Sequence, residues 1–225
     1  MTKPGDFLIG VLDFFAILLP GSLATWLVTQ YFPPGELARV LAFGSSDPDR
    51  VTLWAAFLLS SYVLGHFVFM AGSRLDASYD RWRRRTKPSS RDSTFQAAND
   101  VRKRVTASLA SSDFSTLKWC KTYIQLNASQ ARTEIDRYEA DSKFFRSLVV
   151  VSIAIAAHFL FRQGNVGLGL ACLALTAGAN WRYRDQRWKM TELSYGTAVI
   201  LEATTEAAAK KASRAAVSPG TTDEE

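Results

Sequence analysis

The stretch VTLWAAFLLSSYVLGHFVFMAG, residues 51–72, decides the fold class of this chain: it has 22 residues and only one ionisable side chain that could be charged near neutral pH, His66. As a helix it would cross the ~30 Å hydrocarbon core of a bilayer. A comparable stretch precedes it, because residues 7–32 contain a single charged side chain, Asp13. That stretch is longer than the apolar part of a signal peptide, and no small-residue cleavage site follows it before Pro33. We therefore predict two membrane-spanning helices here.

Two shorter apolar stretches lie in the second half of the chain, at residues 147–161 and 166–181. They contain 15 and 16 residues, which is slightly fewer than the ~17 that usually span a membrane. Snorkelling of the flanking side chains Arg146, Arg162 and Arg182 to the interfaces would make up the difference. We predict a transmembrane hairpin; a re-entrant hairpin and two buried helices of a soluble domain are the alternatives.

Charge is distributed unevenly along the 225 residues, which include 27 Lys/Arg and 21 Asp/Glu. The mean hydropathy of −0.02 averages apolar stretches with highly charged ones. Residues 74–146 contain 16 Lys/Arg and residues 182–225 contain 7, whereas the segments predicted to lie outside hold only Arg39, Arg50 and Arg162. Lys and Arg accumulate on the cytoplasmic side of membrane proteins. The sequence therefore places both termini and the long middle segment in the cytoplasm.

The cytoplasmic segments are predicted to be helical as well. Helical spacing of apolar residues covers residues 93–109 and 114–145, with an N-cap region at Asp113-Phe114-Ser115. The second of these helices continues into the third span without a proline or glycine. The second and fourth spans are likewise expected to continue as helices, through residues 75–82 and 182–213.

The predicted fold is thus an all-α integral membrane protein, with four transmembrane helices that extend into a cytosolic helical bundle. A turn-rich break at residues 86–91 divides the cytosolic part. The predicted regions are two spans with a periplasmic loop, a cytosolic helical region, a transmembrane hairpin, a cytosolic C-terminal helix and a disordered tail, at residues 1–72, 73–146, 147–181, 182–217 and 218–225.

No arrangement of residues predicts catalysis. His66 and His158 lie in predicted spans without cysteines or carboxylates at metal-ligand spacing, and Cys120 and Cys172 fall in different surroundings. The sequence has neither a glycine-rich phosphate loop nor a nucleophile elbow. Acidic and basic side chains within residues 139–146 favour local salt bridges over acid–base catalysis. We therefore expect no enzymatic activity, no cofactor and no bound metal.

Two features of the first span are candidates for a pore or a gate. Asp13 is a carboxylate within an apolar helix, where ionisable residues usually face a cavity or a partner. It would instead lie among the lipid headgroups if the span began later. Pro20 removes a backbone hydrogen bond and Gly21 adds flexibility, so the helix is expected to bend there. Such a bend is either a gate or a purely structural kink.

Small residues form one face of the fourth span. They recur at i, i+4, i+7 and i+11, and they are Gly167, Ala171, Ala174 and Gly178. Small faces let helices approach closely, so this pattern favours helix packing over pore lining. The packing partner is either another helix of the same chain or a second copy.

Basic side chains cluster after the second span. Residues 81–104 contain nine basic and two acidic residues. One interpretation is that the cluster sets topology and contacts anionic membrane lipids. The other is that it binds a phosphate-rich ligand, a nucleotide or oligonucleotide, held by arginines and stacked on Trp82 or Trp119. The candidate ligand-binding residues are Arg81, Trp82, Arg83, Arg84, Arg85, Arg102, Lys103 and Arg104.

Four short motifs together carry a family resemblance: Gly5-Asp-Phe-Leu8, Leu18-Leu-Pro-Gly21, Leu75-Asp-Ala-Ser-Tyr-Asp80 and Glu139-Ala-Asp-Ser-Lys-Phe-Phe-Arg-Ser-Leu148. With them the chain resembles small bacterial membrane proteins of anti-phage defence loci, namely the transmembrane effectors of the Hailong system. The resemblance implies a homo-oligomeric, tetrameric ion channel in the bacterial inner membrane. It also implies a cytosolic crown that binds a DNA oligomer made by a partner nucleotidyltransferase, with the channel closed while the oligomer is bound.

Two functions remain open at this point. The first is a ligand-gated pore, supported by Asp13, by the Pro20-Gly21 pair and by the basic cluster. The second is a non-conducting membrane scaffold that recruits a soluble partner through its cytosolic helices, residues 114–146 and the C-terminal helix. The absence of a polar stripe along the third and fourth spans supports the scaffold.

Overall fold

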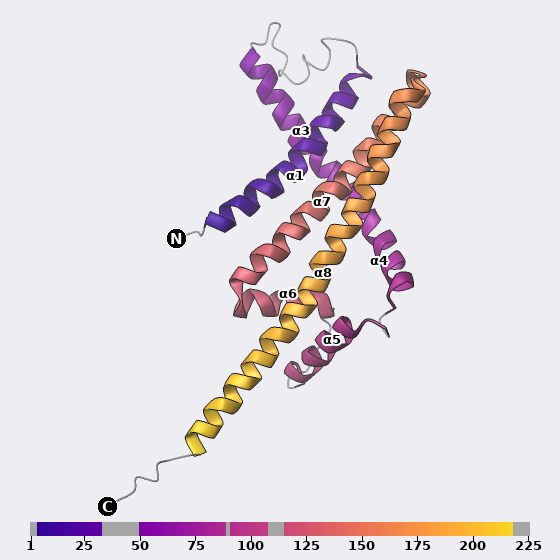
Figure 1. Ribbon diagram of the computed structural model, residues 1–225. Coiled ribbons are helices and arrows are strands. Elements are labelled where there is room, and N and C mark those ends of the chain that lie inside the picture. Colours follow the sequence, from indigo (N-terminus) through magenta and orange to yellow (C-terminus); the bar gives the residue numbers. More distant parts are fainter. Residues whose placement is uncertain (1–3, 33–49, 89–90, 108–114, 218–225) are drawn as a thin grey trace, which may run out of the picture. The chain divides into compact units, whose positions relative to one another are not determined.

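The chain is helical along most of its length (Figure 1). The computed structural model describes residues 4–32, 50–88, 91–107 and 115–217, and no β-strand occurs within these ranges. In chain order the helices are α1 (Pro4–Thr29), α3 (Arg50–Gly72), α4 (Arg74–Thr86), α5 (Ser93–Val105), α6 (Thr116–Asn127), α7 (Ser129–Ala157), the π-helix η1 (His158–Arg162) and α8 (Val166–Val217). The predicted all-α fold is confirmed.

The helices belong to two compact units. The first unit contains Met1–Thr86 and Asp136–Lys189, and the second contains Lys87–Ile135 and Met190–Glu225. Both α7 and α8 contribute residues to each unit, because each of these helices passes from one set of residues into the other.

Two helical stretches in the described part of the chain are long and apolar enough to cross a membrane, Arg50–Thr86 and Ser129–Arg162. They contain the second and third predicted spans. Only 17% of the most apolar window of the first stretch is buried, whereas the core helix of a soluble domain is covered by protein. Large apolar side chains such as Trp54 and Phe67 are exposed on α3. A shorter apolar helix covers Ala16–Thr29, within the first predicted span.

α1 and α3 cross where two glycines meet (Figure 1). A Cβ atom on Gly21 would overlap the carbonyl oxygen of Ser61 and lie 2.8 Å from the backbone nitrogen of Gly65. A Cβ atom on Gly65 would overlap the carbonyl oxygen of Ile17. Beside the crossing, the buried Ser61 hydroxyl donates a hydrogen bond of 3.2 Å to Thr25 Oγ1. Close backbone approach with paired hydroxyls is a common way for apolar helices to associate.

One predicted helix is wrong: a continuous helix over residues 114–145 does not form, because α6 ends at Asn127 and α7 begins at Ser129. Ala128 between them leaves the helical conformation, with φ −149° and ψ 69°. The Asn127 side-chain amide donates to the Tyr123 carbonyl oxygen at 2.8 Å. Asparagine side chains compete for backbone hydrogen bonds in this way and favour the ends of helices.

Several other predicted helix limits are confirmed. α7 runs from polar sequence into the third apolar stretch, and α8 covers the fourth stretch and its extension. The turn-rich segment 86–91 separates α4 from α5, whose N-cap Asp92 accepts a hydrogen bond of 3.0 Å from the Phe95 amide.

The structure differs from the prediction at Ser73. A turn there separates α3 from α4, where a continuous helix was predicted. The loop 33–49, Asp113 and the tail 218–225 lie outside the described residues.

The second unit has a small apolar core. Ala98 of α5, Cys120 and Ile124 of α6 are fully buried in it. Burial raises the pKa of the Cys120 thiol to about 12. At the edge of this core the Tyr123 hydroxyl donates a hydrogen bond of 2.6 Å to Glu202 of α8. The helices α5 and α6 therefore pack together within the second unit, and a cytosolic location of this unit stays a prediction.

Candidate functional site on α4 and α8

One side of α4 contacts α8. Side chains on that side recur at intervals of three or four residues, which places them in line along a helix. The contacts advance in the same direction along both helices: Asp76 pairs with Tyr183, and Arg83 stacks on Trp188. The two helices therefore run parallel where they meet.

The carboxylate of Asp76 joins three helices. Arg146 of α7 donates to its Oδ2 atom at 2.6 Å, and the Tyr183 hydroxyl of α8 donates to its Oδ1 atom at 2.6 Å. The guanidinium of Arg187, also on α8, lies 3.4 Å from the same Oδ1 atom. Hydrogen bonds in which one partner is ionised are among the strongest in proteins. Asp76 therefore fixes the start of α4 against α7 and α8.

Arg146 is buried where it meets this carboxylate, with 7% of its side chain exposed. Its guanidinium lies 4.6 Å from the ring centroid of Phe69, a cation–π contact. Gly72 leaves room for the arginine, because a Cβ atom there would lie 3.2 Å from Arg146 Cγ. A buried guanidinium without its carboxylate would be an uncompensated charge. The Asp76–Arg146 pair is therefore a structural requirement of the first unit.

The Tyr183 hydroxyl stays protonated at this site. Burial raises the pKa of Tyr183 well above its usual range, and the hydrogen bond to Asp76 raises it further. The tyrosine therefore donates to Asp76 as a neutral group and adds no negative charge beside Arg146 and Arg187.

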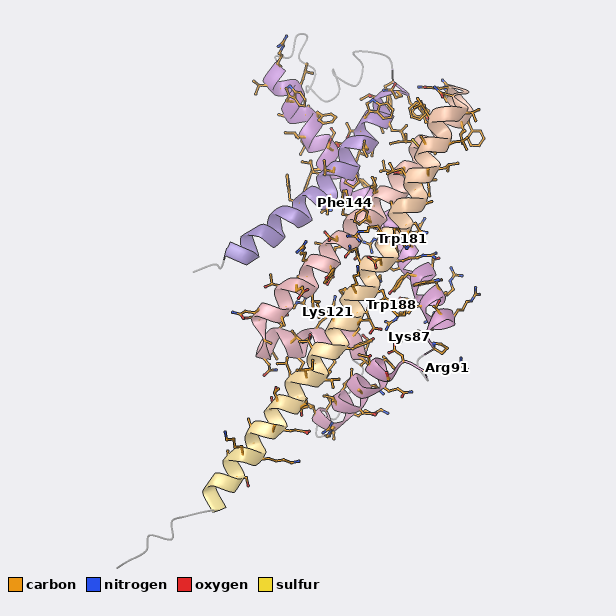
Figure 2. All side chains as sticks on the ribbon, viewed as in Figure 1. Lys87, Arg91, Lys121, Phe144, Trp181 and Trp188 are labelled. Carbon is orange, nitrogen blue, oxygen red and sulfur yellow. The ribbon has the colours of Figure 1, made fainter. Side chains whose placement is uncertain are left out.

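Beyond this network, each of the two helices contributes one tryptophan and one arginine: Trp82 and Arg83 from α4, and Arg184 and Trp188 from α8. We call these four residues the Arg–Trp cluster. The indoles of Trp82 and Trp188 meet edge to face, with ring centroids 6.0 Å apart (Figure 2 labels Trp188). The Arg184 guanidinium lies 5.2 Å from the Trp82 ring, and the Arg83 guanidinium lies 5.5 Å from the Trp188 ring. Each indole is thus covered by one guanidinium.

The other predicted ligand-binding residues of α4 are exposed. Arg81, Arg84 and Arg85 lie on the side of the helix that faces solvent, and no ion pair of theirs occurs among the described residues. Arg81 Nε donates only to the Ala77 carbonyl oxygen, at 3.3 Å. Uncompensated guanidinium groups of this kind attract phosphate.

The remaining predicted basic residues belong to the second unit and are described separately. Arg104 pairs with Glu206, and Arg102 donates to Asn99 Oδ1 at 3.0 Å. Lys103 is exposed on α5. Two of these three side chains therefore already have polar partners within the second unit.

The residues proposed for a pore or gate all fall in α1. Asp13 lies within the helix, and its side chain is outside the described part. Pro20 and Gly21 are buried at the crossing with α3. The structure assigns Gly21 a packing role within one chain, and a gating role stays a prediction.

The small-residue face of α8 is exposed in the single chain. Gly167, Ala171, Ala174 and Gly178 are all exposed, and a Cβ atom on Gly178 would meet no atom within 4 Å. The face of α8 that packs within the chain is a different one, marked by Gly169, where a Cβ atom would overlap Leu160. Packing of the small face between copies stays a prediction.

Sequence reasoning missed the centre of the site. It expected Arg146 to form a local salt bridge, and that was wrong: its carboxylate partner is Asp76, 70 positions away. Only Lys143 forms the expected local pair, with Glu139 at 3.6 Å. The arginines and aromatics of α8 were overlooked as well, although Tyr183-Arg184 and Arg187-Trp188 repeat the same chemistry four residues apart.

Comparison with known proteins adds no assignment, because no protein-family profile, curated sequence or solved structure matches this chain. Within the part of the chain that the structure describes, no cluster of His, Cys, Asp or Glu side chains could hold a metal ion. The chemistry of the site is therefore that of guanidinium groups, indoles and one carboxylate, which suits the binding of anions.

Proposed function

We propose that the protein is a homo-oligomeric membrane effector that forms an ion channel in the bacterial inner membrane and is gated by a cytosolic ligand, a nucleotide or DNA oligomer, in anti-phage defence. In this proposal four helices span the membrane and both termini are cytoplasmic. The observation that carries it is the position of Asp76, which ties α4, with its exposed arginines, to α7 and α8.

The membrane part of the proposal draws on several features. α3 and α7 have the length and hydropathy of membrane helices. The parallel course of α4 and α8 agrees with a topology in which the second and fourth spans both run toward the cytoplasm. Arg162 is exposed at the turn between η1 and α8, as a residue at the outer interface would be.

The ligand part draws on uncompensated charge. Arg81, Arg84 and Arg85 are exposed and have no carboxylate partner among the described residues. Phosphate oxygens bind such guanidinium groups through charge-assisted hydrogen bonds. A ligand held there would pull on α4 directly, and the Asp76 network would pass the displacement to α7 and α8.

The oligomer supplies the pore. Exposed apolar side chains on α3 and the exposed small face of α8 give each copy surfaces for lipid and for its neighbours. In a ring of copies, Asp13 of α1 would face the lumen and select cations, as rings of carboxylates do. A tetramer is the form implied by the family resemblance.

Liposome flux with the purified full-length protein tests the proposal. We expect potassium flux that a short single-stranded DNA oligomer or dATP alters. Replacing the exposed arginines together, as Arg81→Gln, Arg84→Gln and Arg85→Gln, should weaken the ligand effect and its salt dependence while the open conductance persists. Asp13→Asn should lower cation preference and leave ligand affinity unchanged.

The scaffold function is the other outcome of this experiment. Lys210→Gln, an exposed lysine near the end of α8, is the control for loss of positive charge and should change neither flux nor ligand response. Absence of flux under every ligand condition, in protein that is folded and oligomeric, would contradict the channel and favour the scaffold.

A further inference from the structure

The Arg–Trp cluster offers guanidinium groups rather than open ring faces. A cation–π contact holds a guanidinium by its charge and uses none of its N–H donors in a hydrogen bond to the ring, so these donors can bind an anion. Arg184 has no ion pair among the described residues, and its described contact is the stacking on Trp82. The acidic neighbour Asp185 is already paired with Arg182 at 3.1 Å and with Lys189 at 2.9 Å. Arg184 therefore carries a positive charge that no carboxylate among the described residues pairs with.

The same contacts disfavour base stacking on Trp82. Its ring is approached by Arg184 at 5.2 Å, by Tyr79 at 5.7 Å and by Trp188 at 6.0 Å, all measured to ring centroids. A stacking platform for nucleobases needs an open aromatic face. The predicted stacking of a nucleobase on Trp82 is therefore the less favourable use of this cluster, and a phosphate group is the better fit.

The cluster also lies next to surface suited to lipid. Trp181 is 75% exposed and precedes Arg184 by three residues, or ~4.5 Å along the helix axis. Met70, near the end of α3, is 61% exposed. Exposed tryptophan followed by arginine is typical of the boundary between hydrocarbon and headgroups.

We infer that the Arg–Trp cluster is a binding site for the phosphate of an anionic phospholipid in the cytoplasmic leaflet. Arg184 donates to the phosphate, Trp82 and Trp188 hold the two guanidinium groups in place, and the exposed arginines of α4 add long-range attraction. This inference rests on the proposed insertion of the helices into the membrane. It is independent of whether the protein conducts ions.

Native mass spectrometry of the full-length protein in detergent tests the inference, with phosphatidylglycerol and phosphatidylcholine added at equal concentration. The wild-type protein should retain phosphatidylglycerol preferentially. Arg184→Gln removes the charge at similar size and should lower phosphatidylglycerol retention about fivefold, since one basic residue near a membrane surface contributes ~1 kcal/mol. Lys210→Gln removes the same charge from an exposed position and should leave retention unchanged.

A second variant tests whether the tryptophan rings contribute to lipid binding in addition to the charge of the arginines. Trp188→Leu keeps every arginine but removes the ring that holds Arg83, and it should also lower phosphatidylglycerol retention. Equal losses in Arg184→Gln and Lys210→Gln would overturn the inference, as would unchanged retention in Arg184→Gln. The inference also fails if a DNA oligomer or inorganic phosphate displaces the lipid from wild-type protein but not from Arg184→Gln, because the site would then take soluble phosphate.

Extraction of vesicles by alkaline carbonate distinguishes failure of the lipid-site inference from failure of the proposed membrane function. Release of the wild-type protein from phosphatidylglycerol vesicles would contradict membrane insertion and with it both proposals. Retention in the membrane together with unchanged lipid selectivity in Arg184→Gln would contradict the lipid site alone.

Discussion

Arg146 and Asp76 lie 70 positions apart in the chain, and their charged groups meet at 2.6 Å. The arginine side chain is 7% exposed and the aspartate side chain 27%. Because the arginine is desolvated, the stability of the folded protein depends on this carboxylate more strongly than it would depend on one partner of a surface ion pair.

Asp76→Asn should therefore destabilise the protein strongly. The change leaves Arg146 buried without a counter-charge and removes the anionic acceptor of Tyr183, for a loss of ~3–5 kcal/mol. Thermal unfolding in detergent measures the effect. Asp185→Asn is the matched control, because its partners Arg182 and Lys189 are half exposed, and it should cost at most ~1 kcal/mol. Equal losses in the two variants would show that the Asp76 network is an ordinary surface network.

Gly21→Ala should separate α1 from α3. The added methyl group would overlap the Ser61 carbonyl oxygen, and a backbone atom cannot move aside as a flexible side chain can. We expect a loss of ~1–3 kcal/mol, which for a chain of this size lowers the melting temperature by several degrees. Gly196→Ala is the control, since its Cβ atom would meet no atom within 4 Å and it lies outside the small face proposed for packing between copies. If Gly21→Ala melted no lower than Gly196→Ala, the crossing would not be tight.

Single cysteines should report the proposed topology. In a background without Cys120 and Cys172, Arg162→Cys should react with an impermeant maleimide only from the periplasmic side. Arg85→Cys should react only from the cytoplasm. Both arginines are exposed, so access to the reagent depends on the side of the membrane and not on burial. Labelling of both positions from one side would exclude a single crossing of the membrane between them.

Cys120 should be unreactive in the folded protein. Its thiol is fully buried, and burial raises its pKa from 9.0 to about 12, so almost no thiolate exists at pH 8. In a Cys172→Ser variant, alkylation at pH 8 should be at least ~100-fold slower than after denaturation. Fast labelling without unfolding would show that the α5–α6 core opens readily.

The same shift makes a pH prediction for that core. A thiol whose folded pKa is raised contributes stability that is fully present below the unfolded value of 9.0 and is lost as pH rises toward about 12. Stability should therefore fall across this window, and less so in Cys120→Ala.

Local sequence predicted most of the helices but not their contacts. The run at residues 51–72 is apolar at almost every position, so its composition predicts a long apolar helix without any knowledge of neighbours. The end of α6 at Asn127 depends on one side chain competing for a carbonyl oxygen, and a prediction from apolar spacing passes over such an event.

The site was less predictable than the fold, for a physical reason. The basic residues at 81–85 stand out as a run, so the exposure of Arg81, Arg84 and Arg85 on α4 could be predicted from the sequence. The partners of Asp76 lie 70 and 107 positions away, and no periodicity of α4 specifies them. Trp82 was chosen as a stacking platform because a single chain segment does not reveal which side chains will cover its ring.

The separation between Asp76 and its partners also orders events during synthesis. In the proposed membrane topology, the first two helices leave the ribosome and enter the insertion machinery before Arg146, Tyr183 or Arg187 has been translated. Until then the Asp76 carboxylate would stay hydrated at the bilayer surface, and α4 would not be fixed. A nascent chain interrupted before Arg146 leaves the Asp76 carboxylate without its partners on α7 and α8, and the network is complete only once Arg187 has been made.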